Sequence, residues 1–281
     1  MEEFRYRKHA GSDEIVSSLN NFGLAIIDDF YSTSEVNCLN KEFEKAFSLA
    51  EDAGTKRSVL NGQYGLCPRE MVDSHKQDLP QFFKLLHDRK LSEVGGMYFQ
   101  IREDQFHRIN NHVEVEINES TGISNASLPH FDRMPALKMF VYLVDVDADN
   151  GPTFVYPKTY ISVRDKIFAQ LNQIGDVHEL KNFIREESIN SLRNTICGKK
   201  GTLIIADSSS LHGGGNIRKE GLVRKTIRAT TWYLPVSHQQ LSEQALPIKD
   251  SLFILKRHSK EFTGGIDFNA FQSWSELSKG L

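Results

Sequence analysis

The clearest potential for chemistry lies in the segment Leu128-Pro129-His130-Phe131-Asp132, where a histidine and a carboxylate stand two positions apart. In an extended strand, residues i and i+2 point to the same face, so His130 and Asp132 could bind one metal ion. A second histidine from a distant strand would complete a set of two histidines and one carboxylate. Such a set leaves positions on Fe(II) open for a co-substrate and oxygen. The spacing therefore predicts a metal centre that small molecules can reach.

The H-x-D pattern alone does not settle where the metal binds. Ten histidines and 37 acidic residues among 281 give about one H-x-D or H-x-E by chance, and His112-Val113-Glu114 is a competing example. An ordinary pair of strand residues without a metal is the alternative for either motif. The wider sequence favours His130, because a predicted strand ending near Asp207 leads into His212 and three glycines. Glycines there permit a close backbone approach, although a plain glycine turn is the alternative.

A basic residue, Arg224, follows His212 by twelve positions. Arg224, Thr226 and Arg228 share one face of the strand predicted over 223–234, because alternate residues point the same way. Arginine on the inner face of a barrel needs an anion to pair with. A dicarboxylate co-substrate would supply one, since the guanidinium group matches a carboxylate through two hydrogen bonds.

The elements that must position these residues are short strands preceded by helices. A capping box at Ser32-Thr33-Ser34-Glu35 predicts a helix that runs to about Ala50. A second helix is predicted from Pro80 to near Gly96. The predicted strands span residues 23–27, 97–102, 112–118, 137–144, 153–156, 201–206 and 223–234. Many short strands with turn signals, wrapped by helices, indicate a sandwich or jelly-roll barrel.

No repeat, low-complexity tract or linker divides the chain. We therefore expect a single domain over residues 1–281, with a mainly helical part over 1–96 and a barrel core over about 97–236. A helical insertion is predicted over 161–196 within that core, and a C-terminal tail over 237–281.

Composition indicates the kind of partner. The formal net charge is -3, so no strong field attracts nucleic acid or an anionic membrane. The three cysteines lie far apart without C-x-x-C spacing, which is typical of a reducing compartment. There is no apolar signal core, and no stretch approaches the roughly 18 apolar residues of a membrane span. We expect a cytoplasmic protein that acts on a small-molecule substrate; its oligomeric state cannot be predicted.

Taken in order, these motifs resemble the phytanoyl-CoA dioxygenase family of Fe(II)- and 2-oxoglutarate-dependent oxygenases. The family pattern is H-x-D, an apolar strand, Asn-Gly, a turn with proline, a distal histidine before a glycine-rich turn and asparagine, and an arginine. The resemblance covers roughly residues 15–236. The matching residues are His130, Asp132, Lys138 to Val144, Asn150, Gly151, Pro157, His212, Gly213, Asn216 and Arg224.

The resemblance implies a mainly β fold with flanking helices, the double-stranded β-helix or cupin-like jelly-roll barrel. It implies that His130, Asp132 and His212 bind Fe(II). Arg224 would bind the distal carboxylate of 2-oxoglutarate, with Arg228 as the second candidate. The other residues expected at the co-substrate are Phe140 or its face neighbours Lys138 and Tyr142, Thr226, and His112 as a further candidate.

The implied reaction is that of a dioxygenase, which uses O2 and 2-oxoglutarate, hydroxylates a small-molecule metabolite and releases succinate and CO2. Related halogenases have a small residue where this chain keeps Asp132, so hydroxylation or another oxidative outcome such as desaturation is expected. The alternatives are a cupin-like metal enzyme that does not use 2-oxoglutarate and a non-catalytic jelly-roll binding module. The substrate itself cannot be predicted.

Two departures from the family pattern concern the co-substrate. The family often has serine two positions after the distal histidine, where this chain has Gly214. The Pro-Gly-Ser-His turn is replaced by Pro157-Lys158-Thr159-Tyr160. Neither change removes a predicted metal ligand, but another donor, such as Thr226, would have to take the place of the serine.

Overall fold

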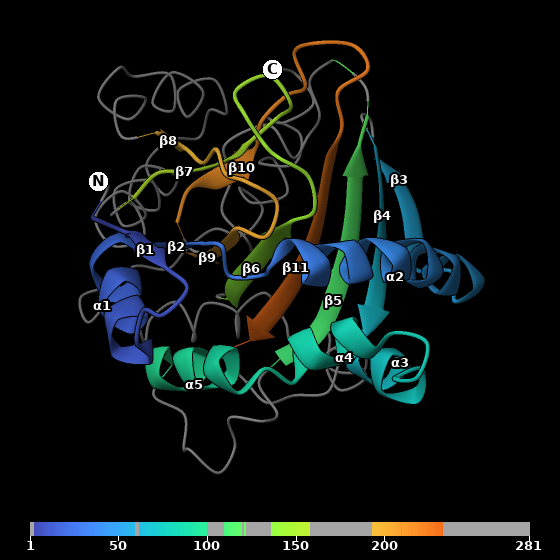
Figure 1. Cartoon of the computed structure of the whole chain (residues 1–281), viewed down its shortest axis with the longest axis horizontal. Coiled ribbons are helices and arrows are strands. Elements are labelled where there is room, and N and C mark those ends of the chain that lie inside the picture. The colour runs from blue at the N-terminus through green and yellow to red at the C-terminus, as the bar shows by residue number, and fades with distance from the viewer. Residues whose placement is uncertain are drawn as a thin grey trace, which may run out of the picture.

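The computed structural model describes residues 3–59, 62–99, 110–119, 121, 136–157, 193–208 and 210–232. Two β-sheets and five helices are formed by these residues (Figure 1). The strands are β1 (Arg5–Arg7), β2 (Leu24–Asp28), β3 (Lys56–Val59), β4 (Gly62–Pro68), β5 (Asn110–Asn118), β6 (Ala136–Tyr142), β7 (Thr153–Val155), β8 (Asn194–Thr195), β9 (Leu203–Asp207), β10 (His212–Gly214) and β11 (Arg224–Trp232). The larger sheet has the order β1-β2-β9-β6-β11-β5-β4-β3, and the smaller has β10-β7-β8.

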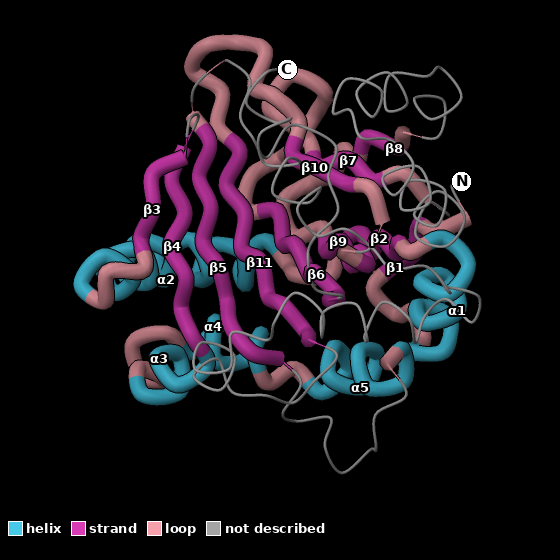
Figure 2. The backbone as a smooth tube through the Cα atoms, turned by 180° about the vertical axis from the view of Figure 1, so that it is seen from behind, coloured by secondary structure: helices cyan, strands magenta, loops and turns pink. Residues whose placement is uncertain are grey.

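The helices lie against one face of the larger sheet, as the view from behind shows (Figure 2). They are α1 (Ser12–Phe22), α2 (Thr33–Asp52), α3 (Arg69–Ser74), α4 (Pro80–Leu86) and α5 (Arg89–Tyr98). Within the described part of the chain, no helix combines the length and apolar character that a membrane crossing requires.

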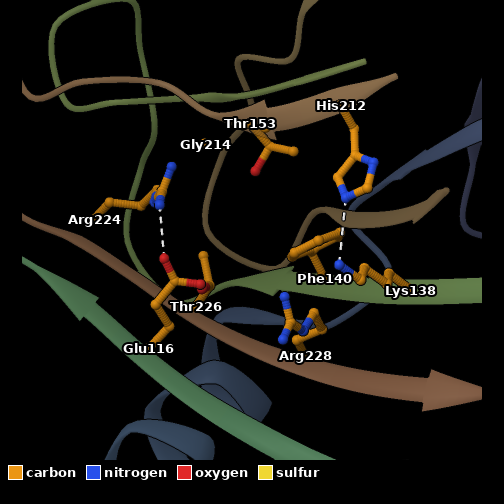
Figure 3. Close-up of a pocket in the computed structure, with 10 residues that line it drawn as sticks. Glu116, Lys138, Phe140, Thr153, His212, Gly214, Arg224, Thr226 and Arg228 are labelled. Carbon is orange, nitrogen blue, oxygen red and sulfur yellow. Dashed lines mark hydrogen bonds and ion pairs between the residues drawn. The ribbon is translucent and has the colours of Figure 1, made fainter. Parts of the chain in front are cut away.

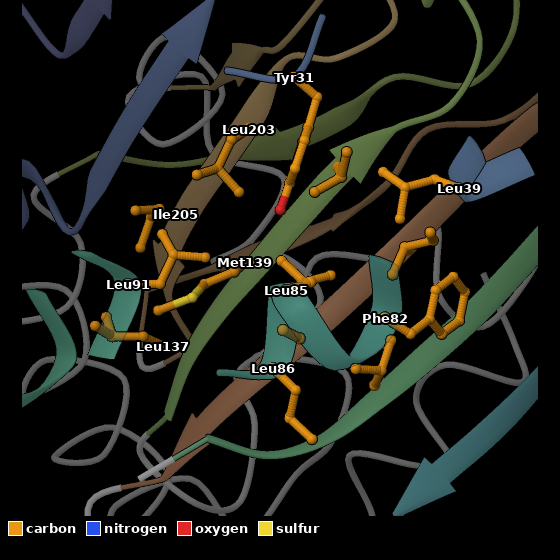
Figure 4. Close-up of a cluster of buried hydrophobic side chains, with 14 of the residues drawn as sticks. Tyr31, Leu39, Phe82, Leu85, Leu86, Leu91, Leu137, Met139, Leu203 and Ile205 are labelled. Carbon is orange, nitrogen blue, oxygen red and sulfur yellow. The ribbon is translucent and has the colours of Figure 1, made fainter. Parts of the chain in front are cut away.

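Strand alternation divides the larger sheet into an apolar outer face and an inner face that is partly polar. Residues that pair directly across antiparallel strands share a face. Ile227 of β11 pairs with Val115 of β5 and Val141 of β6, and all three are fully buried. Leu39, Phe82 and Leu91 of the helices pack over this face, to which β6 contributes Met139 and β9 contributes Ile205 (Figure 4). The outer face therefore holds the main hydrophobic core. The inner face carries a second hydrophobic cluster over β2, β9 and β6, and polar side chains on β5 and β11.

The predicted fold is confirmed in its main elements. The predicted strands near β2, β5, β6, β7, β9 and β11 are present, and the helix predicted from Ser32 to about Ala50 is present as α2. The predicted strand over 97–102 is wrong at its start, because Met97 and Tyr98 end helix α5. The remainder of that prediction, residues 100–102, lies outside the described residues.

Other boundaries also differ from the predictions. The helix predicted from Pro80 is two helices, because the chain turns at His87 and Asp88, and Asp88 caps α5 through Leu91 N at 2.9 Å. The N-terminal part contains strands β3 and β4, which were not predicted. The end of the insertion predicted over 161–196 is not helical, since β8 pairs with β7. Residues 161–192 of the insertion and the tail 237–281 lie outside the described residues.

The N-terminus of α2 contains the segment for which the sequence predicts a capping box. The Ser32 hydroxyl accepts a hydrogen bond from Glu35 N at 3.3 Å, and the Glu35 carboxylate accepts one from Ser32 N at 2.8 Å. The Ser32 backbone amide and hydroxyl hold the pKa of Glu35 at about 2, below its ordinary value. This is the capping box that the sequence predicts.

We expect the Ser32→Ala variant to lose about 1 kcal/mol of unfolding free energy, since an N-cap residue contributes about that much. Because the pKa of Glu35 is lower in the folded state, the contribution of the cap is present above the ordinary pKa of glutamate and is lost as the pH falls towards 2. Urea unfolding at pH 7 and pH 3 measures both effects. Ser34→Ala, which removes a neighbouring hydroxyl, is the control, and an equal loss in both variants would contradict the assignment.

Candidate active site

A pocket opens between the two sheets, on the polar inner face of the larger one (Figure 3). Its empty volume is about 430 Å³, which includes space open to solvent. Strands β5, β6 and β11 form its floor, and β7 and β10 of the smaller sheet form its roof. The lining residues are Glu116, Lys138, Phe140, Thr153, His212, Gly213, Gly214, Arg224, Thr226 and Arg228.

Strand register explains why these side chains meet. Thr226 of β11 lies opposite Glu116 of β5 and Tyr142 of β6, so all three point inward. Two residues further along β11, Arg228 lies opposite Glu114 and Phe140 in the same way. Each strand therefore directs every second residue to the inner face, where some of them line the pocket, and the residues between them face the outer core.

His212 is held with one ring nitrogen facing the pocket. It begins β10, is 5% exposed, and pairs with Val155 of β7. Its Nδ1 lies 2.8 Å from the carbonyl oxygen of Ser210. A carbonyl can only accept, so Nδ1 carries a proton, and Nε2 is directed into the pocket, 3.3 Å from Lys138 Nζ. A backbone carbonyl that fixes the tautomer in this way is typical of histidines that bind metals.

The other two predicted metal ligands, His130 and Asp132, lie outside the described residues. Among the residues that are described, no group of three or more His, Cys, Asp or Glu side chains could hold a metal ion. The structure thus places the distal histidine in the pocket, and the complete ligand set stays a prediction.

Arg224 lies at the opposite side of the pocket from His212 (Figure 3) and is 4% exposed. Its Nη2 donates to Glu116 Oε1 at 2.8 Å, and its Nη1 donates to the carbonyl oxygen of Gly151. Asn118 Nδ2 donates to the same Glu116 oxygen at 2.7 Å. Burial raises the pKa of Glu116, but Arg224, Asn118 and Lys138 outweigh it and hold that pKa below its ordinary value. Arg224 and Glu116 are therefore an ionised pair.

The glycines around Arg224 make room for its guanidinium group. A Cβ at Gly214 would lie 2.8 Å from both Nη1 and Nη2 of Arg224. Gly151 has a φ of 76°, and a Cβ there would lie 2.7 Å from the carbonyl oxygen of Gly215. The family often has serine at the position of Gly214. The glycine here has a physical reason, because any side chain would displace Arg224 from its present position.

Two buried polar atoms beside this ion pair have unused hydrogen-bonding capacity. Thr226 Oγ1 and Arg224 Nε have no hydrogen-bond partner among the described residues. Buried donors normally find an acceptor, and an unpaired donor is costly. A carboxylate in the pocket could accept from both. The site therefore fits the distal carboxylate of 2-oxoglutarate, with Thr226 in the place of the missing serine.

The remaining predicted site residues divide into two groups. Phe140 lines the pocket, and the guanidinium carbon of Arg228 lies 5.7 Å from the centre of its ring. Arg228 also donates to Glu114. His112 is buried on the same inner face, with its Nε2 3.2 Å from Glu114 Oε1, but it does not line the pocket. The competing motif His112-Val113-Glu114 thus contributes to an ion-pair network with Arg228.

Glu116 was not among the predicted site residues, although His112, Glu114 and Glu116 alternate with apolar residues in the sequence. An acidic residue at every second position of an apolar strand signals a polar inner face. The sequence could not show that Glu116 stands beside Arg224, because 108 residues separate them along the chain.

Solved structures share this fold. The non-heme alpha ketoglutarate dependent carbocyclase SnoK from nogalamycin biosynthesis matches with a TM-score of 0.54 and 13% identity, over 79% of this chain and 86% of that one. EctD from S. alaskensis, crystallised with 2-oxoglutarate and 5-hydroxyectoine, matches with a TM-score of 0.53 and 17% identity, over 80% of this chain and 77% of that one. The epimerase SnoN, in complex with Fe3+ and alpha ketoglutarate, matches with a TM-score of 0.52 and 13% identity, over 79% and 83%.

At these identities the likeness shows the fold alone: a double-stranded β-helix of the jelly-roll type, as the sequence predicted. No family model and no curated protein sequence matches the chain.

Proposed function

We propose that this protein is an Fe(II)- and 2-oxoglutarate-dependent dioxygenase that hydroxylates a small-molecule metabolite, and that it belongs with the phytanoyl-CoA dioxygenases. The observation that carries the proposal is that one pocket holds both a histidine whose Nε2 is directed into it and a buried arginine whose Nε has no hydrogen-bond partner among the described residues. The three neighbours described above, which share the fold, are a carbocyclase, an epimerase and a protein crystallised with 2-oxoglutarate.

Each residue has a role in this proposal. His212 binds the metal through Nε2, together with His130 and Asp132. Arg224 and Thr226 bind the distal carboxylate of 2-oxoglutarate and so direct its keto acid end towards His212. Phe140 provides an apolar wall between the two ends, which limits the access of water to them.

The iron supplies the oxidative chemistry when it is bound with 2-oxoglutarate and O2, and succinate and CO2 are released. The chain orients the co-substrate and excludes water. Thr153 of β7 and Phe140 of β6 close the pocket from opposite sheets, so the co-substrate is held between two rigid layers.

Anaerobic titration of Fe(II) and 2-oxoglutarate into the metal-free protein tests the proposal. We expect a weak visible charge-transfer band that requires both components, because the keto acid chelates the metal. Fe(II) with succinate, which lacks the keto group, is the control and should give no band. A folded protein that gives no band at any concentration of 2-oxoglutarate would overturn the assignment and favour a cupin-like enzyme or a binding module.

A further inference from the structure

The second arginine on the inner face of β11, Arg228, has a donor that the proposed function does not use. Arg228 lies on the floor of the pocket beside Phe140 (Figure 3). Its Nη2 donates to Glu114, whereas its Nε has no hydrogen-bond partner among the described residues. A buried donor without an acceptor costs free energy. An acceptor on a molecule in the pocket would remove this cost.

Arg228 differs from Arg224 in how far the protein encloses it. Both terminal nitrogens of Arg224 donate to the chain, one to Glu116 and one to the carbonyl oxygen of Gly151, and its side chain is 5% exposed. Arg228 donates to Glu114, and its side chain is 21% exposed. The guanidinium group of Arg228 is therefore the more accessible of the two to a molecule that enters the pocket.

Strand register fixes the place of Arg228 along the pocket. Thr226, which the proposed function assigns to the distal carboxylate of 2-oxoglutarate, lies two residues before Arg228, or about 7 Å along the strand. Arg228 pairs with Phe140 on β6. The next inward residue of β6 beyond Phe140 is Lys138, whose Nζ lies 3.3 Å from Nε2 of His212. Arg228 thus stands between the end assigned to the distal carboxylate and the end that holds His212.

Glu114 determines which charge this position accepts. Burial lowers the pKa of Arg228 to about 10, so its guanidinium group stays protonated at neutral pH. Glu114 accepts from that group as its ion-pair partner, so the pair has no net charge. A ligand with one negative charge gains a charge-assisted hydrogen bond from Arg228. A phosphate dianion would bring twice that charge close to Glu114 and would be repelled more strongly.

The ring of Phe140 adds an apolar surface to the cation. The guanidinium carbon of Arg228 lies 5.7 Å from the centre of that ring, which is within the range of a cation–π contact. A carboxylate matches the planar guanidinium group better than other anions do, because it can accept two parallel hydrogen bonds. Cation, counter-charge and ring together fit a monocarboxylic acid with an apolar part next to its carboxylate.

We propose that Arg228 selects the primary substrate, and that this substrate is a small carboxylic acid. Its carboxylate accepts from Arg228, its apolar part packs against Phe140, and it lies beside 2-oxoglutarate towards His212. Glu114 orients the guanidinium group and limits the ligand to a single negative charge. The inference rests on the proposed function for the co-substrate that fills the neighbouring position at Arg224.

Calorimetric titration of the protein with Fe(II) and saturating 2-oxoglutarate, in the absence of O2, tests the inference. The probes are hexanoate and 3-phenylpropionate, each compared with its uncharged amide, and hexyl phosphate. We expect each acid to bind at least about tenfold more tightly than its amide, because the amide offers Arg228 no charge. Hexyl phosphate should bind more weakly than hexanoate.

Two variants should shift this preference in opposite directions. In Arg228→Gln with Glu114→Gln both charges are removed together, so the preference for acid over amide should fall to about twofold or less. In Glu114→Gln alone the repelling charge is lost, so the acids should bind about tenfold more tightly than to the wild type. Hexyl phosphate should gain more than hexanoate, because it carries more charge.

Lys225→Gln with Glu44→Gln is the matched control. Lys225 is on the same strand as Arg228 but belongs to its outer face, where its Nζ lies 2.9 Å from Glu44 Oε1. This double variant also removes one ion pair of β11, and it should leave the preference for acids unchanged.

Three results would overturn the inference. They are a wild type that binds the acids no more tightly than the amides, an Arg228→Gln and Glu114→Gln variant that keeps the preference, and a Glu114→Gln variant that binds the acids more weakly. A double variant that unfolds in urea like the wild type but needs far more 2-oxoglutarate would assign Arg228 to the co-substrate instead. A wild type that gives the charge-transfer band without a preference for acids would leave the proposed function standing.

Discussion

Replacement of His212 by alanine is expected to lower the Fe(II) affinity by more than about 100-fold and to abolish the charge-transfer band with 2-oxoglutarate. Loss of a partner in the outer shell of a metal site already costs about 10–100-fold, and His212 is proposed as a direct ligand. Its ring is held by the Ser210 carbonyl, so no small rotation of a neighbour can replace the lost nitrogen. Anaerobic Fe(II) titration with visible absorbance measures the loss.

His112→Ala is the matched control for this variant. Both histidines are 5% exposed and both lie on strands next to the pocket, so the two substitutions remove similar side chains from similar surroundings. His112 contacts Glu114 and does not line the pocket, so His112→Ala should keep the band. The reverse result, in which the band is lost in His112→Ala and kept in His212→Ala, would assign the metal to the competing H-x-E motif.

Replacement of Arg224 by methionine is expected to weaken 2-oxoglutarate binding by about 30-fold or more, which corresponds to the roughly 2–5 kcal/mol that a buried charge pair loses on truncation. It should also lower the unfolding free energy by about 3–5 kcal/mol. The second effect arises because Glu116 would remain as a buried carboxylate without its cation. Titration with 2-oxoglutarate in the presence of Fe(II) and urea unfolding of the metal-free protein measure the two effects.

A double variant separates binding from stability. In Arg224→Met with Glu116→Gln the buried charges are removed together, so most of the lost unfolding free energy should return. The affinity for 2-oxoglutarate should stay low, because its carboxylate still lacks the arginine. Recovery of both quantities in the double variant would show that Arg224 acts only on stability and would exclude it as the carboxylate-binding residue.

The sequence predicted the elements whose hydrophobic pattern is strong. Residues 112–118 alternate between apolar and polar side chains and form β5, and the apolar run over 137–144 forms most of β6. Strand β4 has no such alternation: Gly65 and Cys67 face the helices, and the strand is stabilised by its pairing with β5. Short apolar runs are ambiguous between helix and strand, which is why Met97, at the end of α5, was assigned to a strand.

The site could be predicted only in the residues that carry a motif. His212 and Arg224 were identified by their spacing and by the glycines between them. Glu116 was not identified, and Lys138 was expected in the pocket but not as a neighbour of His212, since both contacts arise only through the register of β6, β11 and β5. Register is set by many packing contacts at once, and no short stretch of sequence contains it.

The surroundings of Arg224 limit how this pocket can evolve. Four separate segments form them: Glu116 on β5, Gly151 before β7, Gly214 on β10 and Arg224 itself on β11. A mutation of Glu116 or Arg224 leaves a charge without a partner. A side chain at Gly214 would meet the guanidinium group, and one at Gly151 would meet the carbonyl oxygen of Gly215. Each single substitution towards a different co-substrate is therefore deleterious. Only simultaneous substitutions at several of these positions would avoid the unpaired charge or the steric clash. We expect these four positions to show strong epistasis in a mutational scan, and an engineered change of co-substrate to require all of them to be redesigned together.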